Sequence, residues 1–136
     1  MPTYHPNRPP NCPPPEATPM DGVIYRSLQG QTPCQEDALS KRERQIELSE
    51  DIVPQESAEC LFWGLSVWIN IADVRHARRL FSFVRKHQIG KATISSECGV
   101  ILHTPSRSQP EHRTFWRDIN LDLPAVLSVV DLATER

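Results

Sequence analysis

The clearest hydrophobic pattern lies between residues 71 and 88, where apolar side chains recur at three- and four-residue spacing. Such spacing forms one stripe along an amphipathic helix. Asn70 stands where an N-cap is expected, and Asp73 lies in the first turn, where the helix dipole favours an acid. The pattern therefore predicts a helix over 71–88 with Leu80 and Phe81 in the core. The stripe consists of Ile71, Val74, Ala77, Leu80, Phe81 and Val84.

A second helix is predicted from Pro33 to about Leu48. Thr32 can cap it, proline suits the first helical position, and Gln35 completes a capping box. Its apolar positions are sparse, so it should lie on the surface. A polar loop over 49–58 follows.

Runs rich in β-forming residues predict five strands. The turn formed by residues 97–99 would join two of them, 89–95 and 100–103, as a hairpin. A last apolar run, 125–132, fits either a helix or a strand. The order of elements indicates an α+β domain, with a small largely antiparallel sheet and two helices on one face. The five predicted strands are 23–28, 65–69, 89–95, 100–103 and 112–117.

The N-terminal segment has a different composition from the rest. Eight of the 13 prolines fall within residues 1–19. Because proline fixes φ and donates no backbone hydrogen bond, this segment should be a disordered, proline-rich arm. The folded domain would then comprise residues 20–136. The arm could also dock in an aromatic-lined groove, which would make the protein an interaction module.

Composition indicates a small soluble domain. Mean hydropathy is −0.46 and 38% of residues are hydrophobic. No apolar run approaches the roughly 20 residues that span a membrane, and no secretory signal is visible. The four cysteines are widely spaced, so we expect reduced thiols in a cytoplasmic protein.

Charge is distributed unevenly along the chain. Residues 75–117 hold nine of the 15 basic side chains and two acidic ones, whereas residues 1–60 hold ten acidic and five basic ones. A basic block predicts a polyanion such as nucleic acid, an acidic partner protein, or neutralisation by the chain's own acids. Trp116 could stack on an unpaired base. The candidate anion-binding residues are Arg75, Arg78, Arg79, Arg85, Lys86, Arg107, Arg113 and Arg117.

Two histidines suggest an alternative, an enzyme acting on a nucleotide or another phosphate-containing substrate. His103 and His112 bracket the loop 104–111, and Arg107 and Arg113 lie close by in sequence. If the flanking strands pair, both imidazoles could serve acid–base catalysis on a phosphate ester. Residues 112–115 resemble one copy of the His-x-Thr-hydrophobic motif of two-histidine phosphoesterases, and no second copy is present.

A further resemblance involves an arginine and a serine on separate strands. Tyr25-Arg26 and Leu65-Ser66-Val67 resemble the Arg and Ser landmarks of ADP-ribosyltransferases. The acidic third landmark of that family is missing, and Glu111 and Glu135 are poor substitutes for it. The chain has no Cys-x-x-Cys, no His-x-x-x-His and no glycine-rich phosphate loop, so neither a metal nor a cofactor is predicted.

Overall fold

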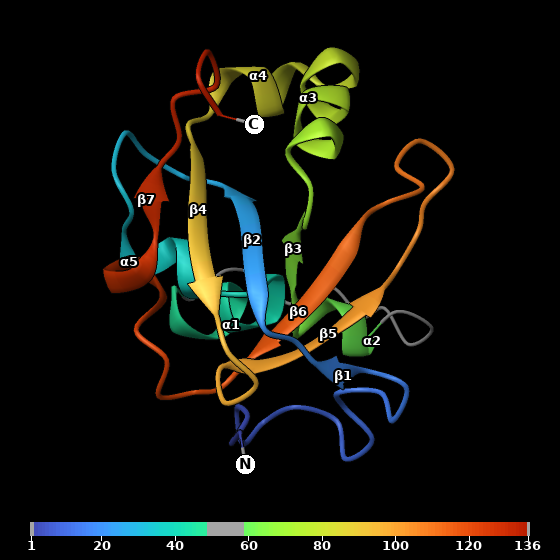
Figure 1. Ribbon diagram of the computed structural model, residues 1–136. Helices are drawn as coiled ribbons and strands as arrows, with labels where there is room; N and C mark the ends of the chain where they lie inside the picture. Colours follow the sequence, from blue (N-terminus) through green and yellow to red (C-terminus); the bar gives the residue numbers. More distant parts are fainter. Residues whose placement is uncertain (1, 49–58, 136) are drawn as a thin grey trace.

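A computed structural model describes residues 2–48 and 59–135 and arranges them in two antiparallel sheets with short helices around them (Figure 1). The α+β class predicted from the sequence is confirmed, with two sheets in place of one. The first sheet has the order β1 (Thr18–Pro19), β5 (Gly99–His103), β6 (Arg113–Arg117) and β3 (Leu65–Val67). The second has the order β2 (Gly22–Ser27), β4 (Ile89–Ile94) and β7 (Ser128–Val129).

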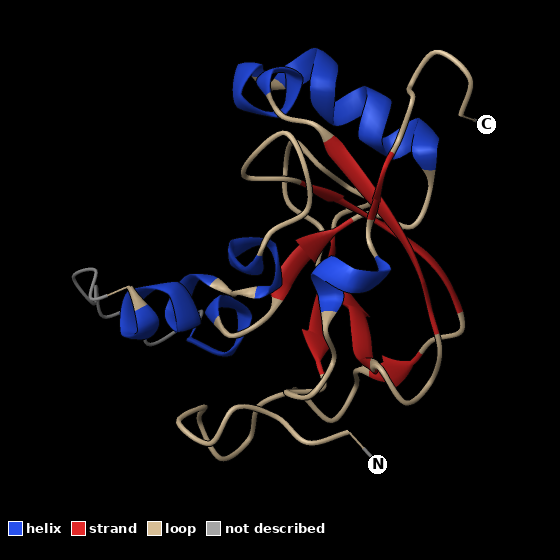
Figure 2. Ribbon diagram, turned by 90° about the vertical axis from the view of Figure 1, so that its left-hand side faces the viewer, coloured by secondary structure: helices blue, strands red, loops and turns tan. Residues whose placement is uncertain are grey.

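The helices are short, and α3 and α4 lie together across one end of the strands (Figures 1 and 2). None of those in the described ranges has the length and apolar content needed to cross a bilayer. The helices are η1 (Gln35–Ala38, a 3-10 helix), α1 (Lys41–Glu47), α2 (Glu59–Phe62), α3 (Ile71–Leu80), α4 (Ser82–Lys86) and α5 (Leu123–Val126).

The two sheets touch at one backbone bridge between β2 and the end of β3. Tyr25 N–H donates to the Trp68 carbonyl at 2.7 Å, and Trp68 N–H donates back at 3.0 Å. No further ladder pair joins β2 to β3 in the described residues. The strands therefore part immediately beyond this bridge.

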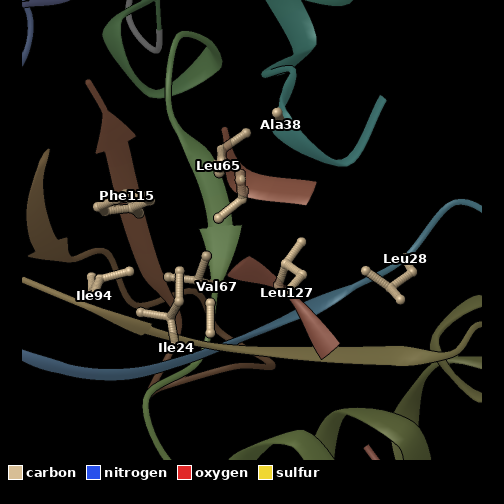
Figure 3. Packing of buried hydrophobic residues seen from close by; sticks show 10 residues of the cluster. Ile24, Leu28, Ala38, Leu65, Val67, Ile94, Phe115 and Leu127 are labelled. Atoms are coloured by element: carbon tan, nitrogen blue, oxygen red, sulfur yellow. The ribbon is translucent and has the colours of Figure 1, made fainter. Parts of the chain in front are cut away.

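Both sheets contribute side chains to one core (Figure 3). Ile24 and Leu28 come from the β2 side, and Leu65, Val67 and Phe115 come from β3 and β6. All five are at most 1% exposed. Because this core fills the space between the sheets, it fixes where β2 and β3 meet and where they separate.

The predicted helix 71–88 is in fact two helices. Phe81 has extended backbone angles, φ −121° and ψ 120°, and separates α3 from α4. Val74 and Val84 are buried as the stripe predicts, but Leu80 is 48% exposed. The prediction of Leu80 as a core residue is wrong, because the break ends the helical periodicity beside it. Phe81 is partly buried against the cluster that contains Val74.

The predicted helix 33–48 is also divided. Ser40 adopts an extended conformation and begins α1, where its hydroxyl accepts from Glu43 N–H and the Glu43 side chain accepts from Ser40 N–H. This reciprocal capping box satisfies donors at the start of α1. Asp37 in η1 is fully buried and accepts hydrogen bonds from the Gln29 and Cys34 amides. The predicted loop 49–58 lies outside the described residues.

The predicted hairpin between 89–95 and 100–103 does not form. β4 pairs with β2 and β7, whereas β5 pairs with β6 and belongs to the other sheet. Gly99 has φ +149°, and a Cβ there would collide with the Trp116 carbonyl. A glycine thus permits the sharp change of direction between the sheets. The run 125–132 ends α5 and continues into β7.

Residues 2–19 differ from the expected disordered arm. Cys12 is 3% exposed and forms a disulfide with Cys60, so the prediction of reduced thiols is wrong for this pair. β1 pairs with β5, and Thr3 N–H donates to Asp118. Proline does keep helices out of this segment, but a covalent link and packing around Trp63 hold it against the domain. The division into domains at residue 20 stays a prediction.

Candidate functional site

The most distinctive local structure is the point where β2 and β3 part. In a continued antiparallel ladder, the next hydrogen-bonded pair after Tyr25 and Trp68 would be Ser27 and Ser66. Arg26 instead extends its guanidinium to this edge, where Nη1 donates to the Ser66 carbonyl at 2.9 Å. Its Nε donates to the Asp37 carbonyl at 2.7 Å. A charged side chain thus occupies the split between the sheets.

A cleft of about 220 Å³ opens at this split and is called the central cleft below. Its lining comes from β2 and β3, from α4 and from the β5–β6 loop. Phe83 on α4 is 57% exposed, so its ring is accessible at the cleft. The lining residues are Arg26, Ser27, Gln29, Ser66, Trp68, Phe83, Val84, His87, Gln109 and His112.

His112 is held by a hydrogen-bond network at the wall of the cleft. Its Nδ1 lies 2.9 Å from the Thr104 hydroxyl and 3.1 Å from the Thr104 carbonyl, and the same hydroxyl lies 2.7 Å from that of Thr114. A carbonyl only accepts, so Nδ1 carries the hydrogen and the neutral ring keeps its lone pair on Nε2. Burial lowers the pKa of His112, and the nearby charge of His103 lowers it further, against the hydrogen bond to Thr104.

Other cleft residues are also fixed by hydrogen bonds. Ser27 Oγ lies 3.0 Å from His87 Nδ1 on the α4 side. Trp68 Nε1 donates to Gln109 Oε1 at 3.0 Å and so orients the amide. Sequence reasoning missed His87, Gln109 and Trp68, because only the pairing of distant strands brings them together.

Arg26 is a partly buried cation, and the charge of a second cation, Arg44, acts on it. Burial lowers its pKa to about 10, and the charge of Arg44 contributes in the same direction. Asp37 and Glu43 oppose this effect. Arg26 therefore stays charged at neutral pH, with part of its side chain bordering the cleft.

The structure does not bring the two predicted catalytic histidines into one cleft. The β5–β6 hairpin forms, and His103 pairs in register with Arg113. However, His103 is exposed, hydrogen-bonds the Pro110 carbonyl and does not line the clefts that contain His112. Of the pair, His112 alone lies beside Arg26 and Ser66.

Several arginines of the basic block form hydrogen bonds to the chain's own backbone. Arg78 donates to the carbonyls of Val84, His87 and Arg85, and so bridges the break between α3 and α4. Arg85 donates to those of Arg78 and Arg79. Arg75 holds the C-terminal segment through the carbonyls of Leu132 and Glu135. These three guanidinium groups therefore serve the fold.

Two other predicted site residues are buried. Arg117 pairs with Glu43 at 2.8 Å, and their side chains are 8% and 6% exposed. Trp116 is 2% exposed and donates to the Cys60 carbonyl. Because the first sheet packs both side chains inward, Arg117 is not available to an external anion and Trp116 is not available to a base. Arg113 lies 3.5 Å from Glu111, and Arg79, Lys86 and Arg107 are exposed.

Among the described residues that line the central cleft, none is acidic. Glu111 borders a smaller adjoining hollow with Asp73 and His76, and Glu135 accepts hydrogen bonds from Tyr25 and Lys91. An acidic third landmark therefore has no counterpart in this cleft.

One group of side chains elsewhere has the composition of a metal site. Ligand atoms of His5, Glu43 and Glu47 lie within 4.8 Å of one another. Because Glu43 is already paired with Arg117 and caps α1, its oxygens have other partners. We assign no metal to this group.

No protein-family model, curated protein or solved structure matches this chain. Function is therefore inferred from the cleft itself. It combines a partly buried arginine, a histidine with a lowered pKa and the exposed ring of Phe83, on three separate elements.

Proposed function

We propose that the protein is an ADP-ribosyltransferase-like enzyme that binds a dinucleotide such as NAD⁺ in the central cleft. The observation that carries this proposal is the direct contact of Arg26 with Ser66 at the split between the sheets. These are the residues whose sequence context resembles the landmarks of that family. The resemblance implies an arginine on one strand and a serine on a later one.

The chemistry of the cleft suits a dinucleotide. Arg26 supplies a permanent positive charge for a phosphate. Phe83, which is 57% exposed, offers aromatic surface on which a flat base can stack. A site with a few fixed polar groups and an apolar remainder is typical for small ligands.

His112 would act as the base in place of an acidic landmark. In ADP-ribosyl transfer, the nucleophile's oxygen bonds to C1′ of the nicotinamide ribose. The C1′–N bond breaks, and its electron pair goes to the nicotinamide nitrogen. The proton lost by the nucleophile would pass to Nε2 of His112, since its lowered pKa leaves that nitrogen unprotonated at neutral pH.

The test is release of nicotinamide from NAD⁺, followed by chromatography. His112→Ala should slow release by at least about 100-fold, the range of a lost general base. Arg26→Lys keeps the positive charge but cannot reproduce both guanidinium hydrogen bonds, to the carbonyls of Ser66 and Asp37. This variant should therefore also release nicotinamide slowly. Arg79→Lys is the matched control, because Arg79 is exposed on α3, and should behave as wild type.

Two results would contradict the proposal. One is wild-type protein that neither binds nor cleaves NAD⁺. The other is turnover that falls in His103→Ala as much as in His112→Ala, which would favour the two-histidine hypothesis. Melting curves of each variant separate a loss of chemistry from a loss of folding.

Other predictions made from the sequence remain open. A polyanion or acidic protein could still meet the exposed cations Arg79, Lys86 and Arg107. A cytoplasmic location also stays a prediction. The Cys12–Cys60 disulfide weighs against it, because disulfides persist mainly in oxidising compartments.

A further inference from the structure

A second hollow lies on the other side of Arg26. It measures about 310 Å³ and shares Arg26 and Ser66 with the central cleft. Its remaining polar lining comes from Ser40, Lys41 and Arg44 at the start of α1. We call it the basic hollow. At roughly 30 Å³ per water molecule, it has room for a phosphate group.

Three cations line this hollow, and its lining holds no acid within residues 2–48 and 59–135. Lys41 Nζ lies 4.7 Å from the centre of the Phe62 ring. Within residues 2–48 and 59–135, no carboxylate forms an ion pair with Lys41. Its charge is thus held at the hollow by an aromatic ring, without a neutralising partner there.

Two acids near these cations, among the residues that the structure describes, have partners elsewhere. Asp37 accepts two backbone amides, and Glu43 pairs with Arg117. Glu36 reaches Arg44 at 3.9 Å, the long limit of an ion pair. Because the charge of Arg44 lowers the pKa of the partly buried Arg26, an anion in the hollow would stabilise the charged form of Arg26.

We propose that the basic hollow binds a phosphate group, next to the dinucleotide in the central cleft. Guanidinium groups and an ammonium together match the several oxygens of a phosphate. The identity of the molecule that carries the phosphate rests on the proposed function, whereas the phosphate site itself does not. That molecule is either the dinucleotide itself, with an extra phosphate as in NADP⁺, or free inorganic phosphate.

The test uses Lys41→Gln and, as its matched control, Lys91→Gln. Both changes remove one positive charge, and Lys91 lies on β4 away from the hollow. Titration calorimetry with inorganic phosphate at constant ionic strength should show binding to wild type and to Lys91→Gln. Lys41→Gln should bind about tenfold more weakly, as expected for one lost charge-assisted hydrogen bond.

Titrations with NAD⁺ and NADP⁺ then identify the source of the phosphate. Tighter binding of NADP⁺ than NAD⁺ by wild type, lost in Lys41→Gln, assigns it to the dinucleotide. Equal affinities, with inorganic phosphate binding in the presence of NAD⁺, assign it to a separate anion. No phosphate binding to wild type, or equal binding to wild type and Lys41→Gln, would overturn the inference.

The same data keep the two proposals apart. If phosphate binding depends on Lys41 but the protein neither binds nor cleaves NAD⁺, the proposed dinucleotide enzyme is refuted and the phosphate site is supported. NAD⁺ cleavage without any phosphate binding would do the reverse.

Discussion

Arg78 and Arg26 are both partly buried arginines, yet their guanidinium groups donate to acceptors in different parts of the fold. Arg78 donates to three carbonyls of its own helical segment. Arg26 donates to one carbonyl on β3 and one in η1, and it borders two hollows. The first lies in the most basic stretch of the chain, the second in its acidic half. Local charge density therefore did not indicate which cation is accessible to a ligand.

The largest effect should come from the most buried cation of the basic block. Arg117→Met leaves Glu43 buried without its partner, so we expect a loss of about 3–5 kcal/mol in unfolding free energy. Urea denaturation measures it. Arg107→Met, at an exposed site, should stay within about 0.5 kcal/mol. A loss below about 1 kcal/mol for Arg117→Met would mean that this arginine is not structural.

The second largest loss of stability is expected for removal of the disulfide, which links the N-terminal segment to α2 beside the basic hollow. Replacing Cys12 and Cys60 together by serine releases a link across 48 residues and should cost about 2–4 kcal/mol. Cys34→Ser, at a free thiol, is the control. Thiol titration of the unfolded, unreduced protein should find the two free cysteines only. Four reactive thiols would contradict the link.

A smaller effect is expected for the clamp across the α3–α4 break. Arg78→Met removes three hydrogen bonds to carbonyls and should cost about 1–2 kcal/mol, since partial exposure weakens them. Arg79→Met on the same helix should change stability by less than about 0.5 kcal/mol. Equal values would show that the clamp contributes nothing, and would leave Arg78 free to bind an external anion.

The smallest effect concerns His112 and pH. Its pKa is lowered in the folded protein, so the unfolded chain binds the proton more readily. Stability attributable to this group is complete above its ordinary pKa of 6.5 and declines as the pH falls below that value. Urea midpoints at pH 7.5 and 5.5 should thus differ more for wild type than for His112→Asn. Parallel changes would show that the ring is not buried as described.

Local patterns predicted local structure well. The strands β2, β5 and β6 follow from β-forming runs, and the α3 cap follows from Asn70, whose side chain accepts from Ala72 N–H. The breaks at Leu39–Ser40 and Phe81 were missed. At both points, residues with extended backbone angles interrupt the helical periodicity.

Long-range structure was less accessible. Arg26 and Ser66 were recognised by resemblance, but their contact requires the bridge between Tyr25 and Trp68. Nothing in the spacing of Cys12 and Cys60 specifies their pairing. His112 was a candidate and lines the cleft, whereas the position of His103 was set by strand register, which sequence alone left open.

The most direct test of the central claim is a ¹H–¹⁵N NMR titration of the full chain with NAD⁺. The account predicts shifts concentrated at the split and its walls, around Arg26, Ser66, Gln109 and His112, with the α3 amides near Arg79 unchanged. Shifts confined to α3 and the exposed arginines would instead place the anion site on the basic block. The absence of any shift at millimolar NAD⁺ would contradict a dinucleotide site in the central cleft.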